Sequence, residues 1–201
     1  LYDSEYKISR SIVQYLNKEE DIQEEILEDI AVNPEAYSFY LQGKYYSQQW
    51  NSESARALTY FKKALEILPD YALAYAGMSV CHTHLALNGY GDFRENISNA
   101  VMYADKSIEA DNSIPDGYTA KALASFWMGN WFVPDFENNI TAALEISPCN
   151  AEIRMFNGMV FLIKGELKRS LSELKLAKQL DPLSSGVNIR LGLSQYLNRE
   201  Y

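Results

Sequence analysis

The chain is short of the residues on which most active sites and metal sites depend. Its 201 residues include two cysteines, Cys81 and Cys149, and two histidines, His82 and His84. Two cysteines do not make a disulfide framework, and with so few histidines no Ser/His/acid or Cys/His arrangement stands out. Cys81 and His84 could share a metal on one helix, but two ligands do not make a structural zinc site. We therefore predict no enzymatic activity, no metal and no cofactor.

Long apolar runs and basic stripes are also missing. No apolar run approaches the length of about 18 residues that indicates a membrane span. The formal net charge is −9, and lysine and arginine are not gathered into a stripe that could neutralise phosphates. We expect neither membrane insertion nor nucleic-acid binding through this region.

The negative charge is concentrated near the start of the chain. Residues 1–35 carry ten acidic and three basic side chains, and the run "KEEDIQEEILED" (18–29) is the densest part. Such a run is typical of a solvated helix face rather than a docking surface. The chain begins with Leu1 and has no basic-then-apolar leader, so we expect an excised or processed fragment.

What the sequence does contain is a repeat. Similar stretches, each with the end of one helix, a turn and the start of the next helix, begin at Ala64, Ser107, Ala143 and Ala177, which are 43, 36 and 34 residues apart. A helix–turn–helix unit of about 34 residues resembles the tetratricopeptide repeat, or TPR. The sequence therefore predicts an all-α fold, a TPR-type superhelix in which antiparallel helix pairs form a solenoid.

Small residues recur where the two helices of each predicted pair should cross. They are Gly43, Ser79, Ala122, Gly158 and Gly192 on the first helices and Ala57, Ala100 and Ser170 on the second helices. Antiparallel helices approach closely only where neither projects a large side chain. Phe136 breaks this pattern, so we expect the third pair to splay or repack.

The repeat register divides the chain into two parts. Residues 1–32 are predicted to be an N-terminal helical connector, and Asn33 and Pro34 should cap and begin the next helix. Residues 33–201 are predicted to be the array, with repeats at about 36–71, 72–114, 115–150 and 151–184 and a partial fifth at 185–201.

Four stretches resemble a more specific group of proteins. They are "ISRSIVQYL" (8–16), "NPEAYSFYLQGKYY" (33–46), "YALAYAGMS" (71–79) and "LDPLSS" (180–185). They resemble the C-terminal TPR region of bacterial signalling proteins that carry a DNA-binding, nucleotide cyclase or kinase domain upstream, often with a TolB-like stretch. The resemblance implies that the connector joins an upstream domain. A cytoplasmic location is favoured, and a periplasmic one stays open if a transmembrane helix lies upstream.

A solenoid of helix pairs offers a long concave face, and this suggests a non-catalytic binding module. Its partner would be a protein or peptide segment, a helix or a neighbouring domain, including the protein's own upstream domain. In TPR arrays the contacts come from fixed positions of each first helix. Here these positions hold Tyr37, Tyr40, Lys44, Leu123, Phe126, Trp127, Met155, Phe156 and Met159.

The sequence leaves two other interpretations open and argues against one ligand. Phe126, Trp127 and Phe156 could instead fill the core between adjacent repeats. A C-terminal carboxylate is not the expected ligand, because repeats that bind one need Lys, Asn and Arg where this chain has Tyr40, Gly77, Asp116 and Ala120. The unfinished fifth repeat, with its apolar Leu191, Leu193, Tyr196 and Leu197, suggests a self-association scaffold and a homo-oligomer.

Overall fold

A computed structural model describes residues 33–49, 53–128 and 134–199 of the chain. These residues form helices and turns and contain no strand, so the predicted all-α solenoid is confirmed. The predicted connector at 1–32 lies outside the described residues. The helices of the described part are α2 (Pro34–Ser47), α3 (Ser54–Ile67), α4 (Ala72–Leu87), α5 (Phe93–Ala110), α6 (Pro115–Trp127), α7 (Pro134–Ile146), α8 (Ala151–Ile163), α9 (Leu167–Leu180) and α10 (Ser185–Asn198).

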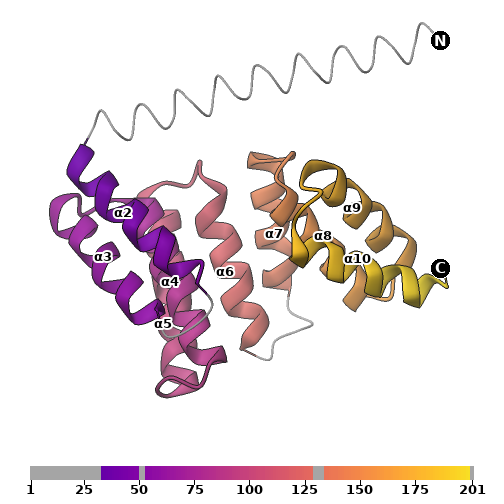
Figure 1. The fold of residues 1–201 in the computed structure, drawn as a ribbon, viewed down its shortest axis with the longest axis horizontal. Helices are drawn as coiled ribbons and strands as arrows, with labels where there is room; N and C mark the ends of the chain where they lie inside the picture. Colours follow the sequence, from indigo (N-terminus) through magenta and orange to yellow (C-terminus); the bar gives the residue numbers. More distant parts are fainter. Residues whose placement is uncertain (1–32, 50–52, 129–133, 200–201) are drawn as a thin grey trace, which may run out of the picture.

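Consecutive helices pair along the chain, and the pairs stack in a row from α2 and α3 at one end to α9 and α10 at the other (Figure 1). The first helices of the pairs are α2, α4, α6 and α8, and α10 continues this series. No helix of the described residues is both long and apolar enough to cross a membrane.

Polar caps determine where several helices begin. The Asn33 side chain accepts a hydrogen bond from the backbone N–H of Ala36 at 3.1 Å, and Pro34 is the first residue of α2, which confirms that prediction. Asn150 caps α8 through the backbone N–H groups of Glu152 and Ile153, at 2.9 and 3.2 Å. Each cap satisfies donors that the first helical turn leaves without a partner.

Close helix crossings occur where the small residues predicted them, with one exception. A Cβ atom at Gly43 would lie 2.6 Å from Phe61 Cε1, and one at Gly158 would lie 2.7 Å from Leu174 Cγ. At Gly192, where the predicted partner is the second helix of a fifth pair, no atom of the described residues lies within 4 Å of a built Cβ, so this crossing stays a prediction. The reason is that no described helix follows α10 to pack against that face.

Two apolar clusters form the core. The N-terminal cluster surrounds Phe61 and Met78, and the C-terminal cluster surrounds Ile140, Ile153 and Leu174. The large Phe136 is buried in the second cluster and packs on Phe126, with 5.3 Å between ring centroids. The third helix pair thus accommodates the large residue by pairing it with another aromatic ring.

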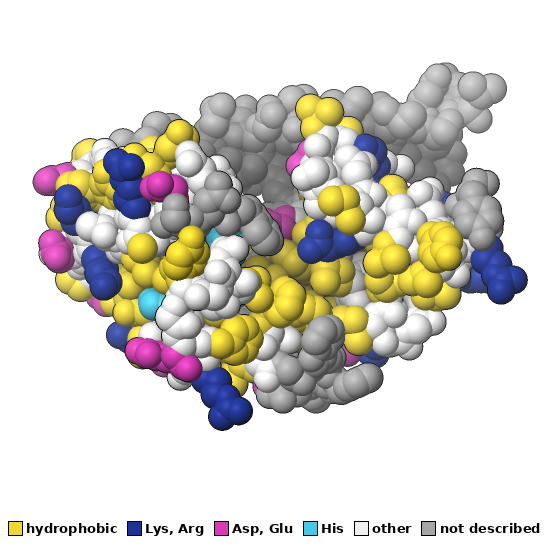
Figure 2. Space-filling view, turned by 60° about the horizontal axis from the view of Figure 1, so that its bottom comes forward, with side chains coloured by type: hydrophobic (Ala, Val, Ile, Leu, Met, Phe, Trp, Pro, Cys, Tyr) yellow, Lys and Arg dark blue, Asp and Glu magenta, His cyan; other side chains and the backbone are white. Residues whose placement is uncertain are grey.

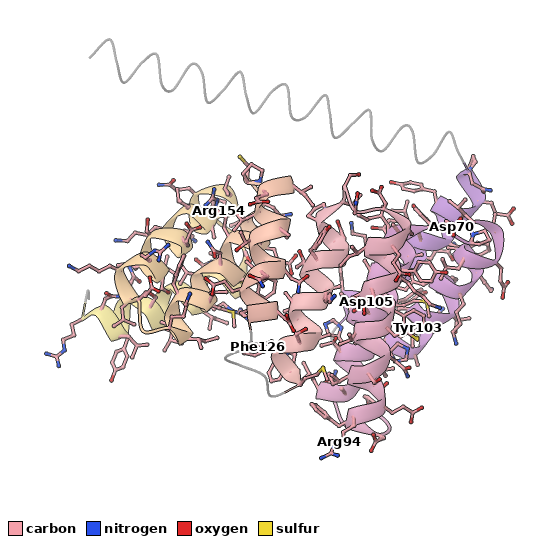
Figure 3. The ribbon with its side chains drawn as sticks, turned by 180° about the vertical axis from the view of Figure 1, so that it is seen from behind. Asp70, Arg94, Tyr103, Asp105, Phe126 and Arg154 are labelled. Atoms are coloured by element: carbon pink, nitrogen blue, oxygen red, sulfur yellow. The ribbon has the colours of Figure 1, made fainter. Side chains whose placement is uncertain are left out.

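Polar contacts join successive elements of the array. The buried Ser107 hydroxyl donates to the Ala72 carbonyl at 2.8 Å, across 35 residues of sequence. Lys121 on α6 forms an ion pair of 2.7 Å with Asp105 on α5, and Arg154 on α8 forms one of 2.8 Å with Glu173 on α9. Figure 3 labels Asp105 and Arg154. These contacts add directional links between neighbouring helices to the apolar packing.

His82 on α4 has one aromatic and one polar neighbour on α5. The imidazole stacks on Tyr103 with 5.4 Å between ring centroids, and its Nδ1 lies 3.0 Å from Asn96 Oδ1. Burial raises the pKa of the neighbouring Cys81 thiol to about 12, while Cys149 is exposed. Both cysteines are free thiols.

Candidate functional site: the concave groove

A groove with a cavity volume of about 430 Å³ runs across the inner helices. Its walls come mainly from α2, α4, α6 and α8, and Arg190 of α10 contributes at one end. Figure 2 shows hydrophobic side chains gathered around a hollow in the middle of the molecule, with charged side chains and a histidine beside it. The array therefore forms a continuous recess from side chains that are far apart in the sequence.

Most of the side chains predicted to bind a partner line this groove. They are Tyr40, Lys44, Leu123, Phe126, Trp127, Phe156 and Met159. Tyr40, Phe126 and Phe156 are buried, so they form its floor as well as part of the core. Trp127 is 36% exposed and Met159 and Leu123 are partly buried, so these three present surface that a ligand can reach.

Tyr37 and Met155 are placed differently. Tyr37 packs beside Tyr40, with 6.1 Å between ring centroids, and is partly buried against the N-terminal cluster. Met155 is 6% exposed and belongs to the C-terminal core cluster. Neither residue is among those that line the groove.

The groove also holds charged residues that the sequence prediction did not include. Asp116 comes from α6, Glu152 from α8 and Arg190 from α10, and His84 lines the wall from α4. Together with Lys44 of α2, they give each inner helix one acidic, basic or imidazole side chain in the groove. Asp116 and Glu152 both lie in the first turn of a helix, so their sequence positions are equally typical of acids that favour a helix N-terminus. Only the stacking of the helices brings Asp116 within electrostatic range of Glu152.

The two carboxylates lie in an environment that disfavours their charge. The partial loss of hydration raises the pKa of Asp116, and the positive charge of Lys44 opposes this effect. The same loss of hydration raises the pKa of Glu152, the negative charge of Asp116 raises it further, and Arg190 and Lys44 oppose both. Both side chains remain more than one third exposed, so water still reaches them between the groove walls.

The basic groups of the groove are held apart from these acids. Arg190 Nε lies 2.8 Å from the sulfur of Met159, and its Nη1 donates to the Gly186 carbonyl at 3.2 Å. Lys44 Nζ lies 5.7 Å from the centroid of the Tyr40 ring. Within the described residues, neither Asp116 nor Glu152 has a basic nitrogen within the 4.0 Å of an ion pair.

The pKa values of Arg190 and His84 are shifted downward. Burial lowers the pKa of Arg190, and the charge of Glu152 opposes that shift. Burial likewise lowers the pKa of His84, against a hydrogen bond with the backbone of Ser47. In the described part of the chain, no three His, Cys, Asp or Glu side chains come close enough together to hold a metal ion.

Comparison with solved structures identifies the type of fold. No protein-family model matches the chain. Among solved structures, a thermophilic TPR protein of Thermus thermophilus is 16% identical, with 83% of this chain and 85% of that chain covered and a TM-score of 0.69. MamA of Desulfovibrio magneticus RS-1 is 15% identical over 83% and 86% of the two chains, with a TM-score of 0.55. The architecture is therefore that of a TPR solenoid.

Another solved structure is described as a TPR protein with an unusual peptide-binding site. This protein, YrrB, is 20% identical over 87% of this chain and 84% of its own, with a TM-score of 0.50. At such low identity the likeness extends to the fold alone.

Two kinds of curated proteins match in sequence. Putative adenylate cyclase 3 of Rhizobium meliloti (strain 1021) is 32% identical over 99 residues, which are 48% of this chain and 17% of that protein. The transcriptional regulator HilA of Salmonella typhimurium (strain LT2) is 23% identical over 159 residues, which are 78% of this chain and 28% of that protein. The matched region thus spans less than a third of the length of these relatives.

Proposed function

We propose that the chain is a non-catalytic interaction module that binds a protein or peptide segment in its concave groove. The observation that carries this proposal is the apolar recess of about 430 Å³, in which Trp127, Met159 and Leu123 present accessible surface above a buried aromatic floor. Apolar clefts with a few polar groups are typical of binding sites. A methionine and a tryptophan together suit an adaptable apolar contact. The peptide-binding site described for YrrB, which has a similar fold, supports the same interpretation.

The biological setting that we propose is a bacterial signalling protein. The curated relatives are a putative adenylate cyclase and a transcriptional regulator, each much longer than the matched region. In such a protein the solenoid would sense a partner or a neighbouring domain and pass that state to an output domain. Recovery of the full-length gene product tests this setting, because an upstream domain without a signalling activity would contradict it.

The groove itself is tested by Met159→Glu. The new carboxylate would face the Arg190 guanidinium, which already contacts the Met159 sulfur at 2.8 Å, so the fold should tolerate it. We expect a peptide selected from a random library on the unaltered chain to bind the variant at least about tenfold more weakly, because the substitution places a charge in an apolar contact. Titration calorimetry gives the dissociation constants, and circular dichroism reports the helix content.

Met102→Glu is the matched control, since Met102 is 40% exposed on α5 and lies outside the groove. It should leave the affinity unchanged. Equal affinity of the unaltered chain, Met159→Glu and Met102→Glu for the peptide would show that the peptide binds outside the groove. Loss of helix in Met159→Glu would show that this side chain belongs to the core.

Self-association is the second candidate, and exposed apolar side chains on α10 favour it. Ile189 is 71% exposed, Tyr196 65%, Leu193 47% and Leu197 44%. A concentration of apolar surface on one helix is typical of an interface. We propose that it contacts either a second copy of the chain or further residues of the same protein.

A further inference from the structure

The charges of the groove follow an order along the array. Lys44 on α2 comes first, Asp116 on α6 and Glu152 on α8 lie between, and Arg190 on α10 comes last. The sequence of signs is therefore positive, negative, negative, positive. Because the four side chains come from successive parts of a solenoid, a segment lying along the groove meets them one after another.

We infer that the groove selects a partner-protein segment that presents a basic side chain to Asp116 and Glu152 and apolar side chains to Leu123, Trp127 and Met159. This inference rests on the proposed function, because it names the chemistry of the segment that the groove binds. It assigns Asp116 and Glu152 as specificity residues.

The first argument is the cost of covering the two carboxylates. Neither has an ion-pair partner among the described residues, and water between the groove walls now solvates both. An occupant displaces that water. An apolar occupant would leave two unpaired charges under cover, which is strongly unfavourable, whereas lysine or arginine replaces the lost hydration with charge-assisted hydrogen bonds.

The second argument is that the groove's own bases do not neutralise the acids. Arg190 is held by Met159 and the Gly186 carbonyl, and Lys44 lies over the Tyr40 ring. Both lower the pKa of Glu152 through their positive charge, without forming an ion pair with it. Lys44 and Arg190 lie at the two ends of the groove and would repel the ends of a long basic segment. The bound segment should therefore carry its basic side chains only near its centre.

The third argument is the register along each helix. On α6, Asp116 and Leu123 are seven residues apart and line the same groove, and on α8 Glu152 and Met159 have the same spacing. Seven residues correspond to about 10 Å of helix, or two turns. Both helices thus present an acid at their start and an apolar side chain about 10 Å further on. A bound segment needs its basic and apolar groups at a similar separation.

The source of the segment follows from charge. Residues 1–35 of this chain carry ten acidic and three basic side chains, so most of this region is repelled by the two carboxylates. A separate protein with a basic and apolar segment is the better complement.

Three short fluorescent peptides test the inference on the full chain. All are rich in leucine, and their centre holds two lysines, two glutamines or two glutamates. We expect the lysine peptide to bind about tenfold more tightly than the glutamine peptide, as two partly exposed ion pairs allow, and the glutamate peptide to bind most weakly. Fluorescence anisotropy gives the dissociation constants.

The double variant Asp116→Asn, Glu152→Gln should lose the tenfold preference for lysine and keep its affinity for the glutamine peptide. The control Asp70→Asn, Glu109→Gln changes the net charge equally but lies outside the groove, and Figure 3 shows Asp70 at the end of the array away from Arg154. This control should retain the preference.

The possible failures differ in what they overturn. If the glutamine peptide binds as tightly as the lysine peptide, or the double variant keeps the preference, the basic partner is rejected and the peptide groove stands. If the glutamate peptide binds most tightly, Lys44 and Arg190 dominate and the inference is wrong. If none of the peptides binds, both the inference and the proposed peptide-binding function are rejected. Displacement of the lysine peptide by a synthetic peptide of residues 1–32 would assign the groove to the chain's own segment.

Discussion

At the scale of the residue, the two groove carboxylates lie where burial disfavours their charge. The pKa values of Asp116 and Glu152 are raised in the folded chain, so the folded state binds protons more readily than the unfolded state between the ordinary and the raised values. As the pH falls through that window, these two groups make the fold more stable. At a pH above the raised pKa values, where both carboxyl groups are ionised, they make the fold less stable.

The double variant Asp116→Asn, Glu152→Gln should therefore melt at or above the temperature of the unaltered chain at pH 7. The difference should shrink as the pH is lowered toward 4, because protonation then removes the same charges from the unaltered chain. Thermal unfolding followed by circular dichroism gives the melting temperatures at each pH. The variant Asp70→Asn, Glu109→Gln is the reference for the general loss of negative charge. A double variant less stable than this reference at pH 7 would show that the carboxylates stabilise the fold.

At the scale of the element, Gly158 and Gly192 occupy equivalent positions in their repeats but have different surroundings. Gly158 on α8 lies against Leu174, where a Cβ atom would come within 2.7 Å of Cγ, and Leu174 is fully buried. Gly192 on α10 is exposed, and no described atom lies within 4 Å of its Cβ position. Both positions are inside helices, so alanine improves the helix propensity at each.

We expect Gly158→Ala to lower the free energy of unfolding by about 1–3 kcal/mol, because an extra methyl group overfills a packed crossing. Gly192→Ala should raise it by about 0.5–1 kcal/mol, since only the backbone entropy of the unfolded chain changes. Urea denaturation measures both values. Equal effects of the two substitutions would contradict the crossing of α8 and α9 described above.

At the scale of the whole molecule, the exposed apolar side chains of α10 are the surface through which we expect association. The exposed apolar residues of α10 are not covered by any described helix, and an end repeat of a solenoid normally has a polar outer face. We expect the chain to self-associate with rising concentration. Leu193→Glu should abolish this association, whereas Met102→Glu, at a residue of similar exposure on α5, should not.

Size-exclusion chromatography with light scattering over a range of concentrations gives the mass. A monomer at every concentration would reject the scaffold and leave the concave groove as the candidate interaction surface. The same experiment on a chain extended by its natural downstream residues asks whether they cover α10. If the extension removes the association, the exposed face is an internal surface of a longer array.

The sequence by itself determined the repeat, the helix pairs and many of the close crossings. These depend on local signals, namely apolar spacing, proline and capping residues such as Asn33, and small residues such as Gly158, each of which acts within one unit. It also indicated most of the apolar side chains of the groove, because they recur at fixed positions of each first helix.

Only the tertiary structure decided which of those side chains line the groove and what charge surrounds them. Met155 has the same apolar character as Met159 but is buried in the C-terminal core cluster, with its sulfur 3.4 Å from a Cβ atom built at Gly186 of α10, whereas Met159 lines the groove. Asp116 and Glu152 are 36 residues apart and each is typical of a helix start. Their proximity depends on how units stack, and that stacking is the sum of many contacts between repeats, which no single repeat encodes.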